Sequence, residues 1–499
     1  MDAQALMQQF AGATPGGSMP ILGGSLGGSN ADLIKALEAS NYQTDVATLE
    51  GGGALGVQSL DTAMKTTVQE NEHFTLFNKL QQTSATNIVD EYVRQSNVGG
   101  FLGGSTNSQM GVVRSAQGEY SREVGMVKFL MTLRQVGYVL NIGKNIVAAT
   151  AVEERNGASQ LLTDAEYLLF HGNADVSPVQ FDGIFAQLDK EIATGKMSED
   201  SVVDMQGRKL DSVEEFSKIN VAVSRYGSWG RSTDVFMPVS VQNDLNMGLD
   251  PAFRWTPGGN NTPMLGGHVE GIRLQNGVLK TNMDTFIHDE ENPMVYPFEV
   301  FNPVIATQNV LFKPASIAGV AASDVSSQFT TTRAGNYYYA VAGVGGNGEG
   351  LTEIVKSAQV AVAAGDAVTL TIAESASKAE TGYAIYRGRQ DGTDDVKDFR
   401  LVKMIKKSGA TTTFVDQNRD MPGTVSIPLL NMAPNADAIG WRQFQSMTKI
   451  PLPFGVGGMP VISWFQFLFG YLRMTKPKHH GYIKNILPSN AKWRPHTGE

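Results

Sequence analysis

The longest amphipathic segment of the chain lies between residues 145 and 182. Its apolar residues recur at helical spacing and form one stripe, made of Ala158, Leu161, Leu162, Ala165, Leu168 and Leu169. Polar residues fall off that stripe: Glu153, Glu154, Arg155, Gln160, Asp164 and Glu166. Gly172-Asn173 follows, as expected for a left-handed C-cap, and Pro178 prevents an early restart. The pattern predicts one long helix that packs with one face, then a turn at Phe181-Asp182-Gly183 into a second packed segment.

A glycine-punctuated stretch without helical periodicity precedes this helix, at residues 96–127. Strand-like segments flank it at Ile88–Val93 and Met126–Val139, and the second partly alternates apolar with polar residues. A connection of this length is usually functional or disordered. We therefore predict a long protruding hairpin between these two strands.

The residues after the helix alternate between helical and strand patterns. A capping box opens a helix predicted over 212–226, and a buried strand at 233–237 is followed by a short helix at 240–247. Residues 271–280 predict a hairpin around Asn276-Gly277, the dipeptide that a two-residue type I′ turn favours.

The block from about 314 to 425 has a different character. Short alternating segments are separated by turn signals at nearly regular spacing. This arrangement is typical of a β-sandwich. The predicted strands are 337–344, 354–362, 367–372, 383–387, 399–405 and 411–415. Afterwards the mixed pattern resumes, with strands expected around 461–474 and 482–486.

Composition narrows the class of protein. The chain has 499 residues, of which 41% are hydrophobic and 18% charged, so it can bury a real core in roughly two to four domains. The net charge of -9 argues against a surface that coats nucleic acid, which would be basic. The absence of cysteine excludes disulfides, a thiol nucleophile and a cysteine-based zinc site. The N-terminus lacks a signal-peptide pattern, and the apolar run at 461–474 is shorter than the roughly 20 residues of a membrane span.

No motif indicates catalysis. The G-x-G-x-x-G match at 343–348 is followed by a strand and not by a helix, so it predicts a hairpin loop and no cofactor site. His479-His480 would point to opposite faces of a strand, which disfavours a metal site. The acidic turn Asp289-Glu290-Glu291 is a weak calcium candidate and more often a solvated loop. We predict a non-enzymatic protein without cofactor or metal.

The order of elements resembles the major capsid protein of tailed bacteriophages, the Hong Kong-type shell fold. The likeness covers roughly 58–310 and 426–490, and it depends on the order and spacing of several segments, because no single motif is specific. These segments are YSREVGMVKFLMTLRQVGY (120–138), AEYLLFHGN (165–173), FDGI (181–184), RSTDVFMPVSVQNDL (231–245) and LRMTKPKHHGYIKNI (472–486), the last of which looks like the final strand pair of the peripheral domain.

The resemblance implies an α+β fold with an inserted all-β module that looks like an immunoglobulin-like or fibronectin type III domain and projects from the outer shell surface. The implied divisions are an N-terminal arm (1–57), the start of the peripheral domain (58–95), the extended loop (96–127), the peripheral domain with the spine helix (128–200), the axial domain (201–313), the inserted module (314–425) and a return through both domains (426–499). A short helix at 30–39 is expected within the arm.

The implied function is self-assembly as hexamers and pentamers into an icosahedral head that encloses double-stranded DNA, in the host cytoplasm and then in the virion. A separate scaffold, a portal and decoration proteins are the further partners implied, with no membrane. Two alternatives stay open: an encapsulin-like cellular compartment, and a β-sandwich binding protein.

Contacts between subunits are expected to involve charges on the extended loop and on the spine helix. The candidates are Arg114, Glu119, Arg122 and Glu123 on the loop, and Glu153, Glu154 and Arg155 on a neighbour's helix. Their alternative role is that of solvated charges, since exposed pairs contribute only about 0–1 kcal/mol. One family member forms a covalent cross-link from a loop lysine to a neighbour's asparagine. Here 96–127 contains no lysine and the first is Lys128, so we predict no cross-link.

Overall fold

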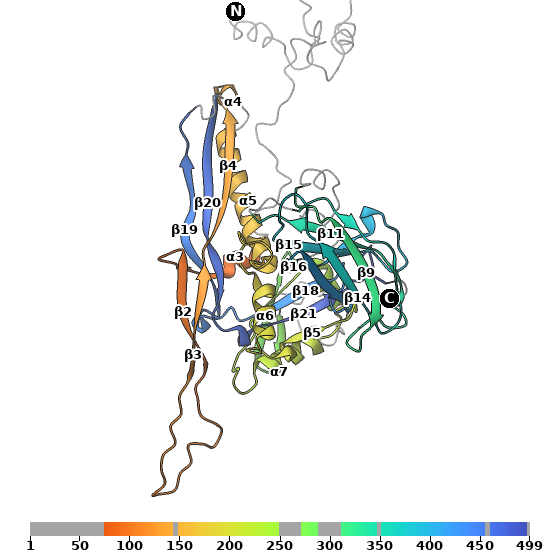
Figure 1. Ribbon diagram of the computed structural model, residues 1–499. Coiled ribbons are helices and arrows are strands. Elements are labelled where there is room, and N and C mark those ends of the chain that lie inside the picture. Colours follow the sequence, from red (N-terminus) through yellow and green to blue (C-terminus); the bar gives the residue numbers. More distant parts are fainter. Residues whose placement is uncertain are drawn as a thin grey trace, which may run out of the picture. The chain divides into compact units, whose positions relative to one another are not determined.

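The computed structural model describes residues 74–142, 148–248, 271–287, 311–346, 351–454 and 460–496. Its helices and strands segregate into distinct layers, which confirms the predicted α+β class (Figure 1). The expected N-terminal arm with its helix at 30–39 and the acidic turn at 289–291 lie outside the described residues.

One layer is a four-stranded sheet of order β1-β19-β20-β4, which joins strands from the two ends of the described chain. Helix α5 packs on β4 and β20 (Figure 1). Gln466 on β20 reaches across and donates to the carbonyl of Glu154 at 2.9 Å. The elements are β1 (Gln81–Ser84), β4 (Lys128–Gly137), α4 (Tyr138–Ile142), α5 (Ala149–His171), β19 (Ile439–Pro451) and β20 (Val461–Met474).

The apolar stripe of α5 is confirmed. Leu161, Ala165, Leu168 and Leu169 are buried, and Ala158 and Leu162 are half-buried at its edge. The prediction that Glu166 lies on the polar face is wrong, because Glu166 is completely buried. Helical spacing could not show this, since the partners of Glu166 come from elsewhere in the chain.

The helix ends at Gly172 as predicted, but the reason for glycine is different. Gly172 has φ −56° and ψ 139°, so no left-handed cap forms. A Cβ at Gly172 would lie only 2.3 Å from the carbonyl oxygen of Phe181. The chain folds back there, and the N–H of Gly183 donates to the carbonyl of Gly172 at 2.8 Å. Glycine is required by the close approach of two backbone segments.

A six-stranded sheet of order β5-β21-β18-β6-β8-β7 forms the second layer. Its core is continuous with that beneath α5, since buried residues of both layers belong to one cluster. The chain's last strands separate: β20 stays in the first sheet, whereas β21 enters the second. The expectation that 472–486 forms a strand pair of the peripheral domain is therefore wrong. The elements are β5 (Val202–Asp204), β6 (Asp234–Met237), β7 (Gly271–Leu274), β8 (Gly277–Met283), β18 (Val425–Leu430) and β21 (Gly481–Ile486).

Short helices and 3-10 turns connect the strands, and one of these turns belongs to the β-sandwich described below. They are α3 (Thr75–Lys79), α6 (Ile184–Ala193), α7 (Glu214–Val223) and α8 (Val239–Gly248), with 3-10 turns η4 (Glu199–Ser201), η7 (Val396–Asp398), η8 (Pro434–Ala436) and η10 (Pro477–His479). The predicted helix over 212–226 is shorter at both ends, and the Ser212 hydroxyl accepts the N–H of Glu214 at 3.1 Å. The hairpin at 271–280 is confirmed, but its type I′ turn is wrong. Leu274 pairs with Gly277, and neither Gln275 nor Asn276 has positive φ.

Residues 316–416 form a four-stranded sheet of order β12-β11-β15-β16, a three-stranded sheet of order β17-β14-β9 and a two-stranded sheet β10-β13, and side chains from all three share one apolar core. This confirms a β-sandwich; its kinship with immunoglobulin-like modules stays a prediction. The buried Arg387 pairs with Asp416 at 2.7 Å inside it. The strands are β9 (Ser316–Ser323), β10 (Gly335–Tyr337), β11 (Tyr339–Val344), β12 (Val355–Lys356), β13 (Val360–Val362), β14 (Asp366–Ala373), β15 (Gly382–Arg387), β16 (Arg400–Lys406) and β17 (Thr411–Asp416).

The sandwich is tied to the C-terminal segment by specific contacts. The Nδ1 of His496 lies 3.1 Å from the Tyr337 hydroxyl, and the Gln390 N–H donates to the carbonyl of Pro495 at 2.9 Å. The indole of Trp493 donates to the carbonyl of Asp398 at 3.1 Å. Removal of 314–425 would therefore also expose surfaces that the C-terminal segment now covers.

The backbone approach at Gly172 gives a first prediction. Gly172→Ala forces the Cβ into the carbonyls of Phe181 and Leu168, so the free energy of unfolding should fall by about 1–3 kcal/mol in chemical denaturation. Gly137→Ala is the matched control, because its Cβ would meet no atom within 4 Å. Equal stabilities of the two variants would contradict this account of the helix end.

Candidate inter-subunit surface

A long hairpin leaves the four-stranded sheet near Tyr471. It is formed by β2 (Val89–Asn97) and β3 (Glu119–Met126), which pair from Val89↔Met126 to Asn97↔Glu119. The predicted hairpin partner, Met126–Val139, is wrong. That segment is mainly β4, which pairs with β20 along its whole length. The true second strand lies inside the glycine-punctuated stretch, so the loop proper is 98–118.

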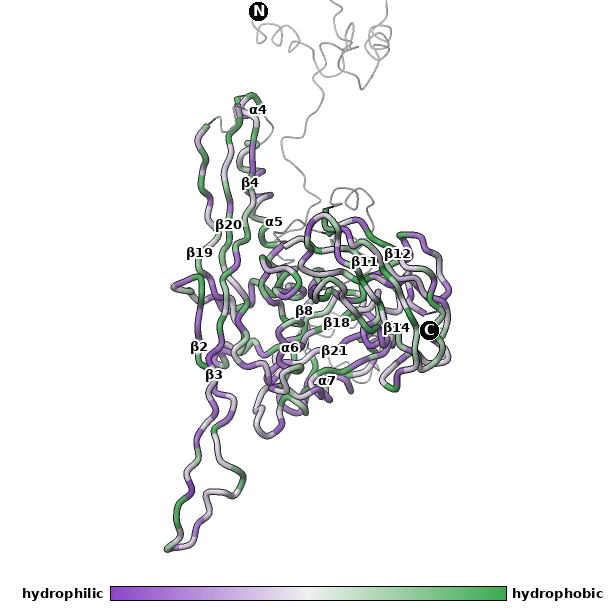
Figure 2. The backbone as a smooth tube through the Cα atoms, viewed as in Figure 1, coloured by the Kyte–Doolittle hydropathy of each residue, from purple (hydrophilic) through white to green (hydrophobic). Residues whose placement is uncertain are grey.

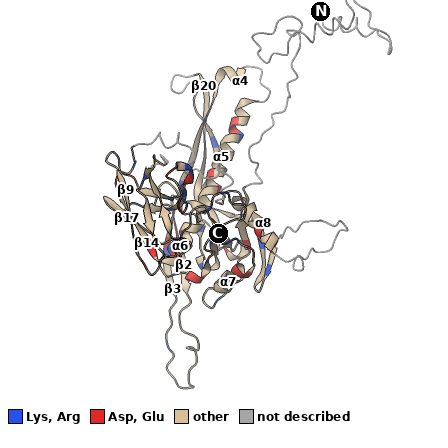
Figure 3. Cartoon of the chain, turned by 90° about the vertical axis from the view of Figure 1, so that its right-hand side faces the viewer, with Lys and Arg blue, Asp and Glu red and all other residues tan. Residues whose placement is uncertain are grey.

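The tip of this hairpin is apolar and uncharged. Residues 98–113 contain no Lys, Arg, Asp or Glu, and Figure 3 draws the hairpin end largely in the colour of uncharged residues. Figure 2 shows hydrophobic stretches within it. Met110 is 97% exposed and Val112 92%. Contiguous exposed apolar residues typically mark an interaction site. We call the exposed residues Val98, Phe101, Leu102, Met110, Val112 and Val113 the apolar tip.

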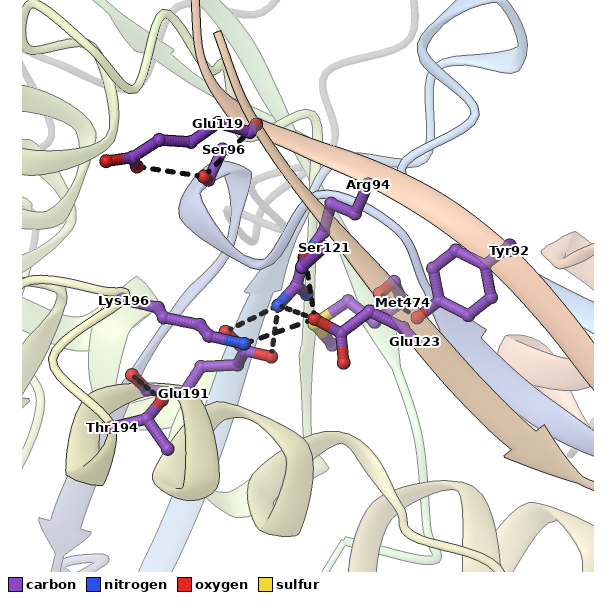
Figure 4. A network of polar contacts seen from close by, with 10 residues as sticks. All are labelled: Tyr92, Arg94, Ser96, Glu119, Ser121, Glu123, Glu191, Thr194, Lys196 and Met474. Atoms are coloured by element: carbon purple, nitrogen blue, oxygen red, sulfur yellow. Dashed lines mark hydrogen bonds and ion pairs between the residues drawn. The ribbon is translucent and has the colours of Figure 1, made fainter.

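The base of the hairpin is held by a charge network (Figure 4). Arg94 on β2 contacts Glu123 on β3 at 3.0 Å and Glu191 on α6 at 2.9 Å. Lys196 and Ser121 also donate to Glu123, at 3.1 and 2.9 Å. Burial disfavours ionisation of Glu123, but the bonds from Lys196 and Ser121 and the charge of Arg94 outweigh it and hold its pKa below the usual value. The network joins both hairpin strands to the body of the protein.

A second apolar surface lies on the face of the four-stranded sheet opposite α5. Leu133, Met131 and Phe129 of β4 stand beside Phe465, Phe467 and Phe469 of β20 in register. The ring centroids of Phe129 and Phe469 are 4.9 Å apart, and those of Phe467 and Phe469 are 4.8 Å apart. Because alternate strand residues face opposite sides, α5 covers one face and leaves this one open. We call these six residues the aromatic face.

The predicted loop charges mostly find partners within the hairpin or beside it. Glu123 belongs to the network at the base, Arg122 pairs with Glu91 at 3.3 Å, and the Ser96 hydroxyl donates to Glu119 at 3.2 Å. Arg114 lies over the ring of Phe101, with its guanidinium carbon 5.7 Å from the centroid.

The predicted charges of the helix lie on α5, whose acidic positions are visible in Figure 3. Glu153 pairs with Arg134 of β4 at 3.2 Å, and Glu154 pairs with Lys449 of β19. Arg155 is exposed and has no charged partner among the described residues. The loop charges and the helix charges do not meet within one chain, so a contact between subunits stays a prediction.

His479 and His480 do not point to opposite faces of a strand, as the sequence predicts. His479 ends the 3-10 turn η10, and both rings face Asn431: its N–H donates to Nδ1 of His480 at 3.1 Å, and its amide lies 3.2 Å from Nδ1 of His479. Burial is the main reason that the pKa of His480 is lowered to about 3, and the charge of His479 lowers it further. These rings are packed structural groups. No cluster of three potential ligands among His, Cys, Asp and Glu occurs in the described residues.

Two further expectations concern loops and membranes. Strand β11 ends at Val344, which forms an antiparallel bridge with Leu351. Residues 347–350 of the glycine-rich connection lie outside the described residues, so the expected hairpin loop stays a prediction. Within the described ranges, no helix combines the length and apolar character needed to cross a membrane.

Sequence reasoning missed the aromatic face. Phe465, Phe467 and Phe469 alternate at spacing two, which is a detectable signal of one shared face. The run at 461–474 is apolar almost throughout, so the sequence predicts a buried strand and does not single out one face as exposed. The pairing with β4, more than 300 residues away, has no local signal.

No protein-family model and no curated protein matches the sequence. Solved structures align over most of the chain at low similarity. They include a chain from Microbacterium phage Oxtober96 (8% identity, TM-score 0.40, 86% of this chain and 96% of that chain). They also include a chain of the holo-SrpI encapsulin complex from Synechococcus elongatus (8% identity, TM-score 0.36, 88% of this chain and 95% of that chain). A third is a chain from the capsid of a native GTA particle (6% identity, TM-score 0.35, 89% of this chain and 100% of that chain).

The network at the hairpin base gives a second prediction. Glu123→Ala removes the acceptor that joins Arg94, Lys196 and Ser121, so β3 should open more often. We expect trypsin to cleave after Arg122 about fivefold faster, the equivalent of about 1 kcal/mol for a partly exposed network. Glu119→Ala is the control, since among the described residues the Glu119 carboxylate accepts a hydrogen bond only from Ser96. A cleavage rate that is unchanged in Glu123→Ala would show that the network does not hold the hairpin.

Proposed function

We propose that this chain is the major subunit of a closed protein shell, and that the apolar tip of one copy packs on the aromatic face of the next. The observation that carries the proposal is that one chain exposes both the apolar tip and the aromatic face, and its own tip cannot reach its own face. Figure 1 shows the hairpin continuing beyond β2 and β3, away from β4 and β20.

Contact between two different surfaces is heterologous. Such contacts generate rings when the rotation between neighbours closes, and open filaments when it does not. Hexameric and pentameric rings of this kind are the units of an icosahedral shell. The rigid base of the hairpin, held by Arg94, Glu123 and Lys196, would fix the direction in which each copy reaches its neighbour.

The energetics favour assembly of many copies over isolated pairs. Burial of the six side chains of the apolar tip contributes roughly 1.5–3 kcal/mol each, or about 9–18 kcal/mol together. Association costs about 4–15 kcal/mol in lost freedom. A single contact is therefore marginal. Ring closure makes the last contacts intramolecular and raises the overall stability strongly.

Charged residues would supply register more than strength. In this proposal Arg114, Glu119 and Arg122 of one copy approach Glu153, Glu154 and Arg155 of another. Exposed pairs of this kind contribute only about 0–1 kcal/mol each. Because α5 lies on the side of the sheet opposite the aromatic face, these pairs would form with a different neighbour from the one that receives the apolar tip, and opposite charges there disfavour wrong neighbours.

The shell would be a virion head that encloses double-stranded DNA without sequence-specific contacts, assembled in the host cytoplasm with a scaffold and a portal. The net charge of -9 suits a container that does not grip DNA. Its role is structural and not enzymatic. A lysine cross-link is not part of the proposal, because the hairpin has no lysine and Lys128 at its base donates to the carbonyl of Pro178.

The proposal predicts that a charge on the aromatic face blocks assembly without unfolding the chain. Met131→Lys should abolish rings and shells in sedimentation and negative-stain electron microscopy, because an unpaired ammonium group resists burial in the contact. Val320→Lys on the sandwich is the matched control, since Met131 is 63% exposed and Val320 64%.

A mixing experiment separates the two surfaces. Val112→Lys on the apolar tip should also block assembly alone. When the two variants are mixed, the intact tip of Met131→Lys can still pack on the intact aromatic face of Val112→Lys. Because one such contact is marginal, the mixture should form dimers only at high protein concentration, and no closed particles at any concentration. Normal shells from Met131→Lys, or no association in the mixture, would contradict the proposed contact.

A further inference from the structure

Two carboxyl groups are buried in contact with each other beneath α5. Glu166 of α5 is 0% exposed and Asp284, which follows β8, is 1% exposed. Their side chains share a hydrogen bond. Two carboxylates cannot share one such bond when both are ionised, so the contact requires a proton.

The pair binds one short segment from several directions. The N–H groups of Leu76 and Phe77 donate to the two oxygens of Glu166, at 2.7 and 2.9 Å. The hydroxyl of Thr75 donates to Oδ2 of Asp284 at 2.7 Å. Phe286 donates its N–H to Oδ1 of Asp284 at 2.8 Å, which fixes the second carboxyl in place. Three consecutive residues of α3 therefore depend on the pair.

Apolar contacts position the same segment but do not satisfy its polar groups. Phe74 stacks on Phe286 with ring centroids 5.7 Å apart, and Phe77 meets Trp441 edge to face at 5.6 Å. Leu76 and Leu80 are buried as well. Without the pair, the buried N–H groups of Leu76 and Phe77 would lose their acceptors.

The surrounding elements offer little to neutralise a second negative charge. Lys79 of α3 is engaged with Asp234 of β6 at 3.3 Å. His171, one turn further along α5, is completely buried, and burial lowers its pKa to about 4, so it is neutral. Burial and then the charge of Asp284 raise the pKa of Glu166 to about 9. Burial likewise raises the pKa of Asp284, against the bonds from Thr75 and Phe286.

We propose that Glu166 and Asp284 form a proton-dependent clamp on residues 74–80, the segment through which residues 1–73 join the rest of the chain. With one proton shared, the pair accepts the bonds of Thr75, Leu76 and Phe77 and holds the segment. When that proton is lost, the two carboxylates repel each other and the segment loosens. This inference is independent of the proposed shell, because every group belongs to one chain.

The direction of the pH dependence follows from the raised pKa values. A carboxyl whose pKa is higher in the folded than in the unfolded state contributes stability that is fully present below its unfolded value. That contribution is lost as the pH rises through the folded value, here about 9 for Glu166. The clamp therefore holds at acidic and neutral pH and opens at alkaline pH.

The absence of cysteine permits a direct test on the full chain. Asn78→Cys places a spin label on the exposed side of α3, and its electron paramagnetic resonance spectrum reports segment mobility. We expect an immobile spectrum at neutral pH and a growing mobile component as the pH passes about 9. The same label at Val320→Cys, on the sandwich, should show no change over this range.

Asp284→Asn supplies the decisive variant. Asparagine keeps an oxygen for the N–H of Phe286, and its amide can donate to an ionised Glu166 without a titrating proton. The label at residue 78 should then stay immobile across the whole pH range. The clamp is refuted if the original spectrum does not change with pH, if Asp284→Asn loosens at the same pH, or if the Val320 label loosens in parallel.

Discussion

The packing of α5 against β4 and β20 is the contact on which the rest of the structure depends. It buries one face of a long sheet and orients the opposite, aromatic face towards solvent. It also brings Glu154 into contact with Gln466, so that residues more than 300 positions apart in the sequence belong to one unit. The C-terminal end of the same helix turns at Gly172 into α6, whose Glu191 anchors the hairpin base. Both proposed surfaces of the subunit thus derive their position from one helix.

Each of the two apolar surfaces is held in place by a neighbouring part of the fold. The hairpin is fixed by the charges around Glu123, and the sheet face is fixed by α5 behind it. A flexible tip would lose more entropy on association, whereas a held tip has lost much of that freedom already. Pre-organisation of this kind suits a subunit that must make the same contact many times.

Local patterns in the sequence predicted the parts of the fold that depend on neighbours along the chain. The stripe from Leu161 to Leu169, the buried strand at 234–237 and the alternation of Val368, Leu370 and Ile372 all appear in the structure. Long-range pairing was not predictable in this way. Strand β3 was assigned to the loop, β4 was assigned to the hairpin, and Glu166 was placed on the polar face. In the last two cases the deciding partner lies far along the chain: Phe467 for Met131, and Leu76 for Glu166. Strand β3 pairs with the nearer β2, and the glycine-rich composition of 96–127 hid it. Of the candidate site, the hairpin was predicted, whereas the aromatic face that would receive its tip was not.

A disulfide between copies tests the central claim most directly, because the chain has no cysteine of its own. Val112→Cys on an isotope-labelled copy would be mixed with Leu133→Cys on an unlabelled copy under mild oxidation. The account predicts a covalent dimer of one heavy and one light chain, detected by mass spectrometry. The same experiment with Val320→Cys in place of Leu133→Cys should give only background. A heavy-light dimer no more abundant with Leu133→Cys than with Val320→Cys would contradict the contact between the apolar tip and the aromatic face.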